Sequence, residues 1–146
     1  MESNIVLQVG VKILLQNKDG NYLLLRRSLE KYSEIQGRWD IVGGRINPGE
    51  TLLDSLKREI KEEISLVFEG LPTLIAAQDI IRNNGRHVVR LTYVGKIDGE
   101  VILDTEENDM FKWYTFDELK SLDDLDIYFK ELLNNELLWK DIYNKK

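Results

Sequence analysis

Three glutamates on one short segment could bind a metal ion. Glu59, Glu62 and Glu63 lie in the stretch REIKEEISL, and on a helix, which advances about 100° per residue, they project from neighbouring positions. Like charges at this spacing repel by roughly 0.2 to 0.5 kcal/mol per pair, and partial removal from water raises that cost. A divalent cation would reverse the sign of the interaction. Magnesium and manganese accept carboxylate oxygens while leaving positions open for phosphate, so these glutamates suit a hard metal better than zinc.

The acidic pair at Glu62 and Glu63 has a simpler interpretation when it is taken alone. Glutamate is a good helix former, and Arg58 can pair with Glu62 at i,i+4. A solvated acidic edge of a helix is therefore the commoner outcome for such a pair. The residues that precede this segment have to distinguish between the two interpretations.

The segment that must position the glutamates has the pattern of an amphipathic helix from Thr51 to about Ile64. Thr51 and Asp54 stand at the spacing of a capping box, although the second position of that box normally holds Glu or Gln. Apolar residues recur at helical spacing and form a stripe along the helix, and Glu59 and Glu63 lie along one edge of this stripe. The stripe consists of Leu52, Leu53, Leu56, Ile60 and Ile64.

Strands before and after this helix would carry the rest of the site. Residues 5–17 and 21–28 are rich in β-branched and aliphatic types around a Lys-Asp-Gly turn, which predicts a β-hairpin. A short strand, WDIVGG, ends in Gly43 and Gly44, where the backbone needs unusual freedom. Strands interspersed with two main helices indicate an α/β fold with a mixed β-sheet between helices. Further strands are predicted at 73–81, 87–97 and 111–116, a short helix at DELKSL and a helical segment at 126–143.

Composition narrows the class of protein. A chain of 146 residues with 42% hydrophobic and 32% charged residues is sized for one compact domain, and we expect residues 1–146 to form it. The absence of cysteine excludes a disulfide framework, a thiolate zinc site and a cysteine nucleophile, and is compatible with a cytoplasmic location. The net charge of −6 is a poor match for a nucleic-acid backbone, and no apolar run reaches membrane-spanning length. We therefore expect neither nucleic acid nor membrane as a partner.

Read from Gly44, the stretch GRINPGETLLDSLKREIKEEISL resembles the Nudix box. In that pattern a glycine is followed after five residues by glutamate, and after seven more by Arg-Glu-apolar-any-Glu-Glu-any-Gly-apolar. Agreement in both spacing and identity is far more specific than an acidic pair. Ser65 departs from the pattern, because the family usually has glycine there, where a left-handed residue often ends the helix. The matching residues are Gly44, Glu50, Arg58, Glu59, Ile60, Glu62, Glu63 and Leu66.

The resemblance extends beyond the box to MutT-like members of the Nudix hydrolase superfamily. LLLRRS and WDIVGG are similar to the strands that precede the box there, with Val42 in place of a frequent proline. EENDMFKWYTFDEL is similar to the acidic loop, strand and short helix that follow it. From about Val6 to Leu119, the resemblance implies the Nudix α/β/α sandwich. Members of the superfamily often dimerise, so a homodimer is also an expectation.

The resemblance gives the box residues catalytic roles. It implies that Glu59, Glu62 and Glu63 coordinate Mg2+ or Mn2+, and that Glu59 alternatively helps to deprotonate the attacking water. Glu50 and Arg58 would support them through an ion pair that arranges the loop and the helix.

Residues outside the acidic helix complete the expected site. Arg27 matches a strand arginine that meets substrate phosphate, and a surface salt bridge is nearly as good an interpretation. Gly43 and Gly44 would lie at the substrate, with Gly44 also at the metal. Glu106 and Glu107 occupy a loop that in many members supplies a further metal ligand, and Glu107 is the favoured one of the two.

The implied reaction is metal-dependent hydrolysis of the phosphoanhydride in a nucleoside diphosphate linked to another group. The expected substrate is a (d)NTP or oxidised dNTP, cleaved to NMP and pyrophosphate. ADP-ribose or another nucleotide sugar or dinucleotide is an alternative, although family markers for these are largely missing. A non-catalytic nucleotide sensor is disfavoured because the box glutamates are intact. Nucleic-acid processing would require a local basic patch, for which Arg82, Arg86 and Arg90 are the residues to inspect.

Overall fold

The computed structural model describes residues 4–29, 37–82 and 84–144. Its centre is a seven-stranded sheet of order β3-β2-β1-β6-β5, in which β4 also pairs with β1 and β7 with β2. The strands are β1 (Val6–Gln16), β2 (Tyr22–Arg27), β3 (Trp39–Asp40), β4 (Val42–Arg45), β5 (Thr73–Arg82), β6 (Arg86–Lys96) and β7 (Asn108–Tyr114). The helices are α1 (Leu52–Ile64), α2 (Phe116–Lys120), α3 (Ile127–Leu133) and α4 (Glu136–Asn144).

Strand β1 organises the sheet. It pairs in parallel with β6 over its whole length, from Val6 opposite Arg86 to Gln16 opposite Lys96. On its other side it pairs antiparallel with β4, and the predicted hairpin joins it to β2. Strand β5 is antiparallel to β6. The sheet is therefore mixed, as predicted.

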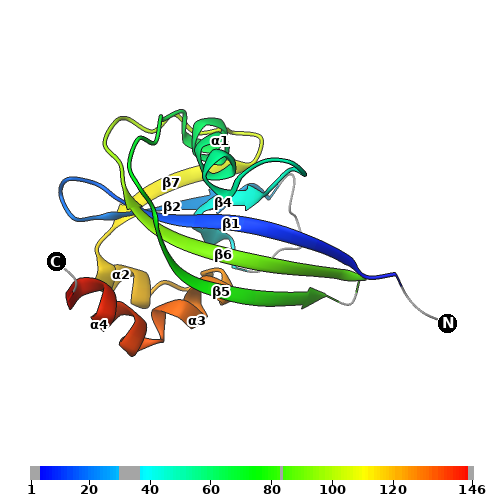
Figure 1. The fold of residues 1–146 in the computed structure, drawn as a ribbon. Coiled ribbons are helices and arrows are strands. Elements are labelled where there is room, and N and C mark those ends of the chain that lie inside the picture. The colour runs from blue at the N-terminus through cyan, green and yellow to red at the C-terminus, as the bar shows by residue number, and fades with distance from the viewer. Residues whose placement is uncertain (1–3, 30–36, 83, 145–146) are drawn as a thin grey trace.

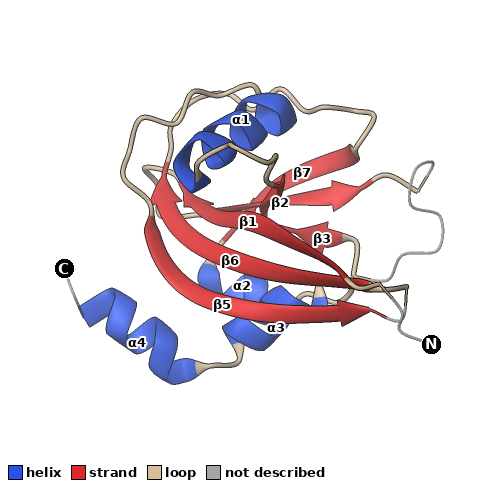
Figure 2. Ribbon diagram, turned by 45° about the vertical axis from the view of Figure 1, so that its right-hand side comes forward, coloured by secondary structure: helices blue, strands red, loops and turns tan. Residues whose placement is uncertain are grey.

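Helices cover both faces of the sheet, which confirms the α/β/α sandwich. Helix α1 lies on one face, while α2, α3 and α4 lie on the other (Figures 1 and 2). Alternate residues of β1 pack against the helices on opposite faces of the sheet, because successive side chains of a strand point to opposite faces. Ile13 packs in the apolar cluster under α1, and Leu14 packs in the cluster under the other three helices.

Two predicted elements are each divided in the structure. The segment 126–143 forms α3 and α4 and not one helix, because Asn134 ends the first helix and the Asn135 side chain accepts a hydrogen bond from the Leu138 N–H near the start of the second. Asparagine favours such caps over helix interiors. The stretch WDIVGG divides into β3, which pairs with β2, and β4, which pairs with β1.

The apolar stripe of α1 is narrower than predicted. Leu56, Ile60 and Ile64 are fully buried, whereas Leu52 at the start of the helix is 38% exposed. The buried face is completed by Ser55, which is small enough to pack against the sheet.

Candidate active site

Helix α1 carries the three glutamates and is capped at both ends. Thr51 Oγ1 accepts a hydrogen bond from the Asp54 N–H at 3.1 Å, which confirms the N-cap half of the predicted box. At the other end Ser65 is left-handed, with φ of 61°, and its N–H donates to a carbonyl one turn back. The position where the family has glycine thus keeps the left-handed geometry despite its side chain. These caps fix the helix that presents Glu59 and Glu63 to β4.

The glycines of β4 allow its backbone to approach the glutamates. The Gly43 N–H donates to Glu63 Oε2 at 2.8 Å. Gly43 has φ of 143°, and a Cβ there would lie 2.0 Å from the Val11 carbonyl oxygen, so only glycine fits. A Cβ on Gly44 would lie 2.6 Å from Glu59 Oε1. Both glycines that were expected at the site therefore lie directly beside a box glutamate.

Arg58 and Glu50 form the ion pair expected from the sequence. Arg58 Nε donates to Glu50 Oε2 at 2.7 Å, and Nη2 donates to Oε1 at 2.9 Å. Hydrogen bonds from Arg58 are the main reason that the pKa of Glu50 is lowered to about 2. Arg58 Nη1 also donates to Glu59 Oε1 at 3.0 Å and to Glu62 Oε2 at 3.1 Å. Arg58 therefore joins the loop before the helix to two of the three glutamates.

The three glutamates differ in their environment. Burial raises the pKa of Glu59, although the Arg58 charge opposes it. Burial also raises the pKa of Glu63 to about 7, against the Lys12 charge and the Gly43 N–H. Glu62 lies outermost, with 56% of its side chain exposed. Two carboxylates that resist ionisation at the edge of a cavity are typical of a functional site.

The glutamates line one end of an open cavity of about 830 Å³. Arg27, Gly43, Gly44 and Glu107 also line it, whereas Glu106 does not appear on the wall that the described residues form. Strands β1, β5 and β6 and helix α3 with its N-cap supply much of the remaining lining, which we call the basic wall. Their lining side chains include Lys12, Ile80, Arg82, Val88, Arg90, Asp126 and Tyr128.

The acidic end has the donor chemistry that a divalent metal ion requires. Glu59, Glu62, Glu63 and Glu107 all line the cavity with carboxylates, and burial raises the pKa of Glu59 and Glu63. The expected convergence is nevertheless incomplete, because no three such side chains in the described part of the chain are grouped closely enough to hold an ion. Arg58 holds two of the carboxylates and β4 holds a third. Coordination would require these hydrogen bonds to be exchanged.

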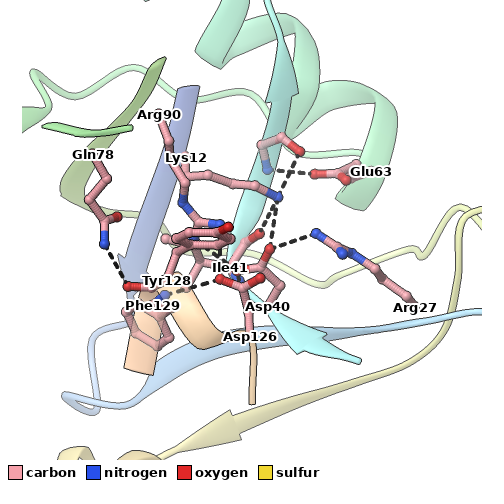
Figure 3. A network of polar contacts seen from close by, with 11 residues as sticks. Lys12, Arg27, Asp40, Ile41, Glu63, Gln78, Arg90, Asp126, Tyr128 and Phe129 are labelled. Atoms are coloured by element: carbon pink, nitrogen blue, oxygen red, sulfur yellow. Dashed lines mark hydrogen bonds and ion pairs between the residues drawn. The ribbon is translucent and has the colours of Figure 1, made fainter. Parts of the chain in front are cut away.

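A buried network of charges centred on Asp40 supports the basic wall, and sequence reasoning did not find it (Figure 3). Asp40, which is 2% exposed, accepts Arg27 Nη2 at 2.8 Å and pairs with Lys12 Nζ at 3.2 Å through Oδ2. Its Oδ1 accepts Arg90 Nη2 at 3.1 Å, and Arg90 Nη1 donates to Asp126 Oδ2 at 2.9 Å. Burial acts to raise the pKa of Asp40, but Arg90, Lys12 and Arg27 outweigh it and hold this pKa well below its usual range.

The structure gives the two arginines of interest different settings. Arg27 lines the cavity, as a residue that meets substrate would, and it pairs with the buried Asp40. Arg90 is 4% exposed and does not belong to a basic surface patch with Arg82 and Arg86, both of which are exposed. The signal that was missed is a single charge inside an apolar strand, as in VGVKILL for Lys12 and VVRLTY for Arg90. Such a charge requires a buried partner.

Sequence comparisons relate the chain to known proteins. The NUDIX domain family model matches residues 6–134. The 8-oxo-dGDP phosphatase NUDT18 of Homo sapiens is 31% identical over 104 residues, which cover 71% of this chain and 29% of that protein. Nucleoside triphosphatase NudI of Escherichia fergusonii is 43% identical over 69 residues, which cover 46% of this chain and 48% of that protein. The matched region thus spans less than half the length of these relatives.

Comparison with solved structures agrees with the family match. The MutT protein from Methanosarcina mazei Go1 superposes with a TM-score of 0.77 at 25% identity, covering 99% of this chain and 100% of that one. Nudix hydrolases generally use a divalent metal ion, which agrees with the carboxylates of α1. The family model covers most of the chain, and the sandwich fold carries an intact acidic helix. The chain belongs to the Nudix hydrolase family and is MutT-like within it.

Proposed function

We propose that this protein is a metal-dependent pyrophosphohydrolase that cleaves a (d)NTP or an oxidised dNTP to NMP and pyrophosphate. The observation that carries the proposal is a single cavity in which carboxylates of α1 face cations of the sheet. A nucleotide polyphosphate needs both walls, because metal ions and basic side chains share the charge of its oxygens. The names of the human and bacterial relatives, a nucleotide phosphatase and a nucleoside triphosphatase, support this class of substrate.

The acidic wall would hold the metal and the attacking water. We assign Glu59, Glu62, Glu63 and Glu107 as ligands of Mg2+ or Mn2+, which when bound polarises a phosphate and lowers the pKa of a water. Glu59 also serves as a candidate proton acceptor, because burial raises its pKa towards the range where a carboxylate can take a proton. Arg58 holds Glu59 in this structure, and this hydrogen bond would have to be given up for Glu59 to bind a metal ion.

The basic wall would receive the rest of the nucleotide. Arg27 is fixed by Asp40 at the cavity wall, where its guanidinium can meet a phosphate. Ile80 and Val88, which are register partners on β5 and β6, supply apolar surface to the same cavity, and Tyr128 lines it as well. A cavity of about 830 Å³ is within the usual size of small-molecule sites. The phosphates would therefore lie at the glutamates and the nucleoside over β5 and β6.

Product analysis of a nucleotide panel tests this proposal. Pyrophosphate and phosphate release would be measured from NTPs, 8-oxo-dGTP, ADP-ribose and a dinucleoside polyphosphate, each with and without Mg2+. We expect Mg2+-dependent pyrophosphate release from triphosphates, and loss of that release in the Glu59→Gln variant. Turnover of ADP-ribose alone would replace the proposed substrate class. Turnover that the Glu59→Gln variant retains in full would refute the site.

The pairing of Glu59 and Glu62 with Arg58 favours a second candidate, a nucleotide sensor without turnover. In a sensor, those ion pairs would persist when nucleotide binds. Calorimetry separates the two candidates, since a sensor binds a nucleotide and releases no product from any member of the panel.

The cellular setting remains a prediction. No helix among the residues that the structure describes has the length and apolar character needed to cross a membrane. A cytoplasmic location, a homodimer and the absence of a nucleic-acid partner stay part of this proposal, and sedimentation of the full chain would test the dimer.

A further inference from the structure

Lys12 is a charged residue in the middle of a buried strand. Its side chain is 14% exposed, and its ammonium lies 3.2 Å from Asp40 Oδ2, from the Ile41 carbonyl oxygen and from the Gly43 carbonyl oxygen. An ammonium has three N–H donors. The three acceptors around Lys12 therefore match its full hydrogen-bonding capacity, and one of them is a carboxylate.

A single residue, Gly43, connects this ammonium to the acidic wall. Lys12 and Gly43 are register partners of β1 and β4. The Gly43 carbonyl oxygen accepts a hydrogen bond from the Lys12 ammonium, and the Gly43 N–H donates to Glu63, so the two side chains bind the two peptide groups that adjoin at Gly43. The Lys12 charge also acts to lower the pKa of both Glu59 and Glu63. A permanent cation is thus within electrostatic reach of two proposed metal ligands.

An ammonium so placed is a competitor for the metal site. The lysine stem is flexible and can direct its charge to another carboxylate. A buried ammonium that loses its carboxylate has a strong drive to find a new one. In the described part of the chain, Asp40 is the carboxylate that an ion pair joins to Lys12.

We propose that Asp40 is a positioning residue that holds the Lys12 ammonium away from Glu63 and thereby keeps this glutamate open to a divalent ion. The inference rests on the metal site of the proposed function. Asp40 is suited to this role because Arg27 and Arg90 fix its two oxygens from other directions. Arg90 is held in turn by Asp126 at the start of α3. The carboxylate therefore keeps its place without Lys12, whereas Lys12 depends on it.

A double-mutant cycle on metal affinity tests the proposal without turnover. Binding of Mn2+ to the metal-free full chain would be measured by the paramagnetic resonance signal of the free ion. The variants are Asp40→Asn, Lys12→Met and the double variant. Lys57→Met is the matched control, because it removes the same charge from an exposed position on α1.

We expect Asp40→Asn to weaken Mn2+ binding by about tenfold, since the released ammonium occupies Glu63. Adding Lys12→Met to that variant should recover about tenfold, whereas Lys12→Met alone should change the affinity by less than about threefold. Lys57→Met should stay within about twofold of the parent chain. Equal effects of Lys12→Met in both backgrounds would mean that only summed charge matters, and would overturn the proposal.

Three outcomes can be distinguished: an unfolded variant, a chain without the metal site, and a metal site in which Asp40 does not have the proposed role. Thermal unfolding monitors whether Asp40→Asn is folded. If Asp40→Asn is not folded, the Mn2+ affinity of the Lys12→Met variant tests the proposal. A gain in affinity of about tenfold or more would show that the ammonium already competes with the ion while Asp40 is present, and would overturn the proposal. A native chain that binds no Mn2+ overturns the metal site and this inference together. A native chain that binds Mn2+ and hydrolyses nucleotide, with no coupling in the cycle, overturns this inference alone.

Discussion

The two walls of the cavity are built in opposite ways. The acidic wall comes mainly from one helix, whose glutamates are neighbours in sequence and need no distant element to bring them together. The basic wall is assembled from strands and a helix that are far apart in the chain, with Arg90 bonded to Asp40 across 50 residues and to Asp126 across 36. One cavity is therefore lined by side chains from a single helix and by side chains from distant segments. Substitutions in the first set should affect activity, and substitutions in the second set should affect stability.

Removal of an acidic side chain should remove activity and leave the fold. Glu59→Ala and Glu63→Ala are each expected to lower kcat/KM on the preferred nucleotide by more than about 100-fold, as loss of a metal ligand does. Stability should be unchanged or higher, because each change relieves repulsion between like charges. Glu106→Ala is the control, since Glu106 is exposed and off the cavity wall. Equal activity of all three variants would contradict the assignment of the acidic wall.

Removal of a basic side chain should instead damage the fold. Arg90→Met would leave Asp40 and Asp126 buried without their shared cation. The free energy of unfolding is expected to fall by about 3 kcal/mol, as measured by urea denaturation. Arg86→Met, on the exposed part of the same strand, should change it by less than about 0.5 kcal/mol. A mild effect at Arg90 would mean that the basic wall is not a structural network.

In the metal-free protein, ionisation of the buried Glu63 should lower the free energy of unfolding, so stability should depend on pH. The pKa of Glu63 is about 7 in the folded chain, above its ordinary value of 4.5. The favourable contribution of this group is thus fully present below about pH 4.5 and is lost as pH rises through about 7. Glu63→Gln removes that loss and should be more stable than the parent chain at pH 8, by on the order of 3 kcal/mol. Urea midpoints of both chains from pH 5 to 8 would diverge, and parallel curves would contradict the assigned pKa.

The smallest expected effect concerns the end of the acidic helix. Ser65 holds a left-handed backbone with φ of 61°, which costs a side-chain-bearing residue more than glycine. Ser65→Gly should raise the free energy of unfolding by up to about 1 kcal/mol, without changing kcat/KM. Ser65→Ala serves as the control and should not stabilise the chain.

The contrast between the walls also explains what could be predicted from sequence. Helical spacing sufficed to place Glu59 and Glu63 along one edge of the helix, because helical geometry converts spacing into direction. The Arg58–Glu50 pair was implied by the resemblance to the Nudix box. Alternating apolar residues sufficed for the long strands and thus for the mixed sheet. These features depend on residues that are close in the chain.

Features that depend on pairing between distant segments were missed. Lys12, Asp40 and Asp126 lie in separate parts of the chain. The pairing of β2 with β3 and the bridge between Trp39 and Leu125 position Asp40 and Asp126, and the parallel register of β1 with β6 puts Lys12 and Arg90 on neighbouring strands. The division of the C-terminal helical segment at Asn134 was missed for a different reason. Its apolar residues continue at nearly helical spacing through the break, so periodicity alone does not reveal the cap.

The parallel pairing of β1 with β6 has a consequence for how the cavity forms. A parallel pair cannot close through a tight turn, so residues from β2 to β5 must be accommodated before Val6 meets Arg86. Long-range closures of this kind are slow, whereas a helix such as α1 forms from local contacts within microseconds. In refolding experiments, we therefore expect helical signal to precede nucleotide binding. The glutamates of α1 would therefore repel one another before the rest of the cavity exists. The nucleotide-binding cavity would form only when β1 pairs with β6.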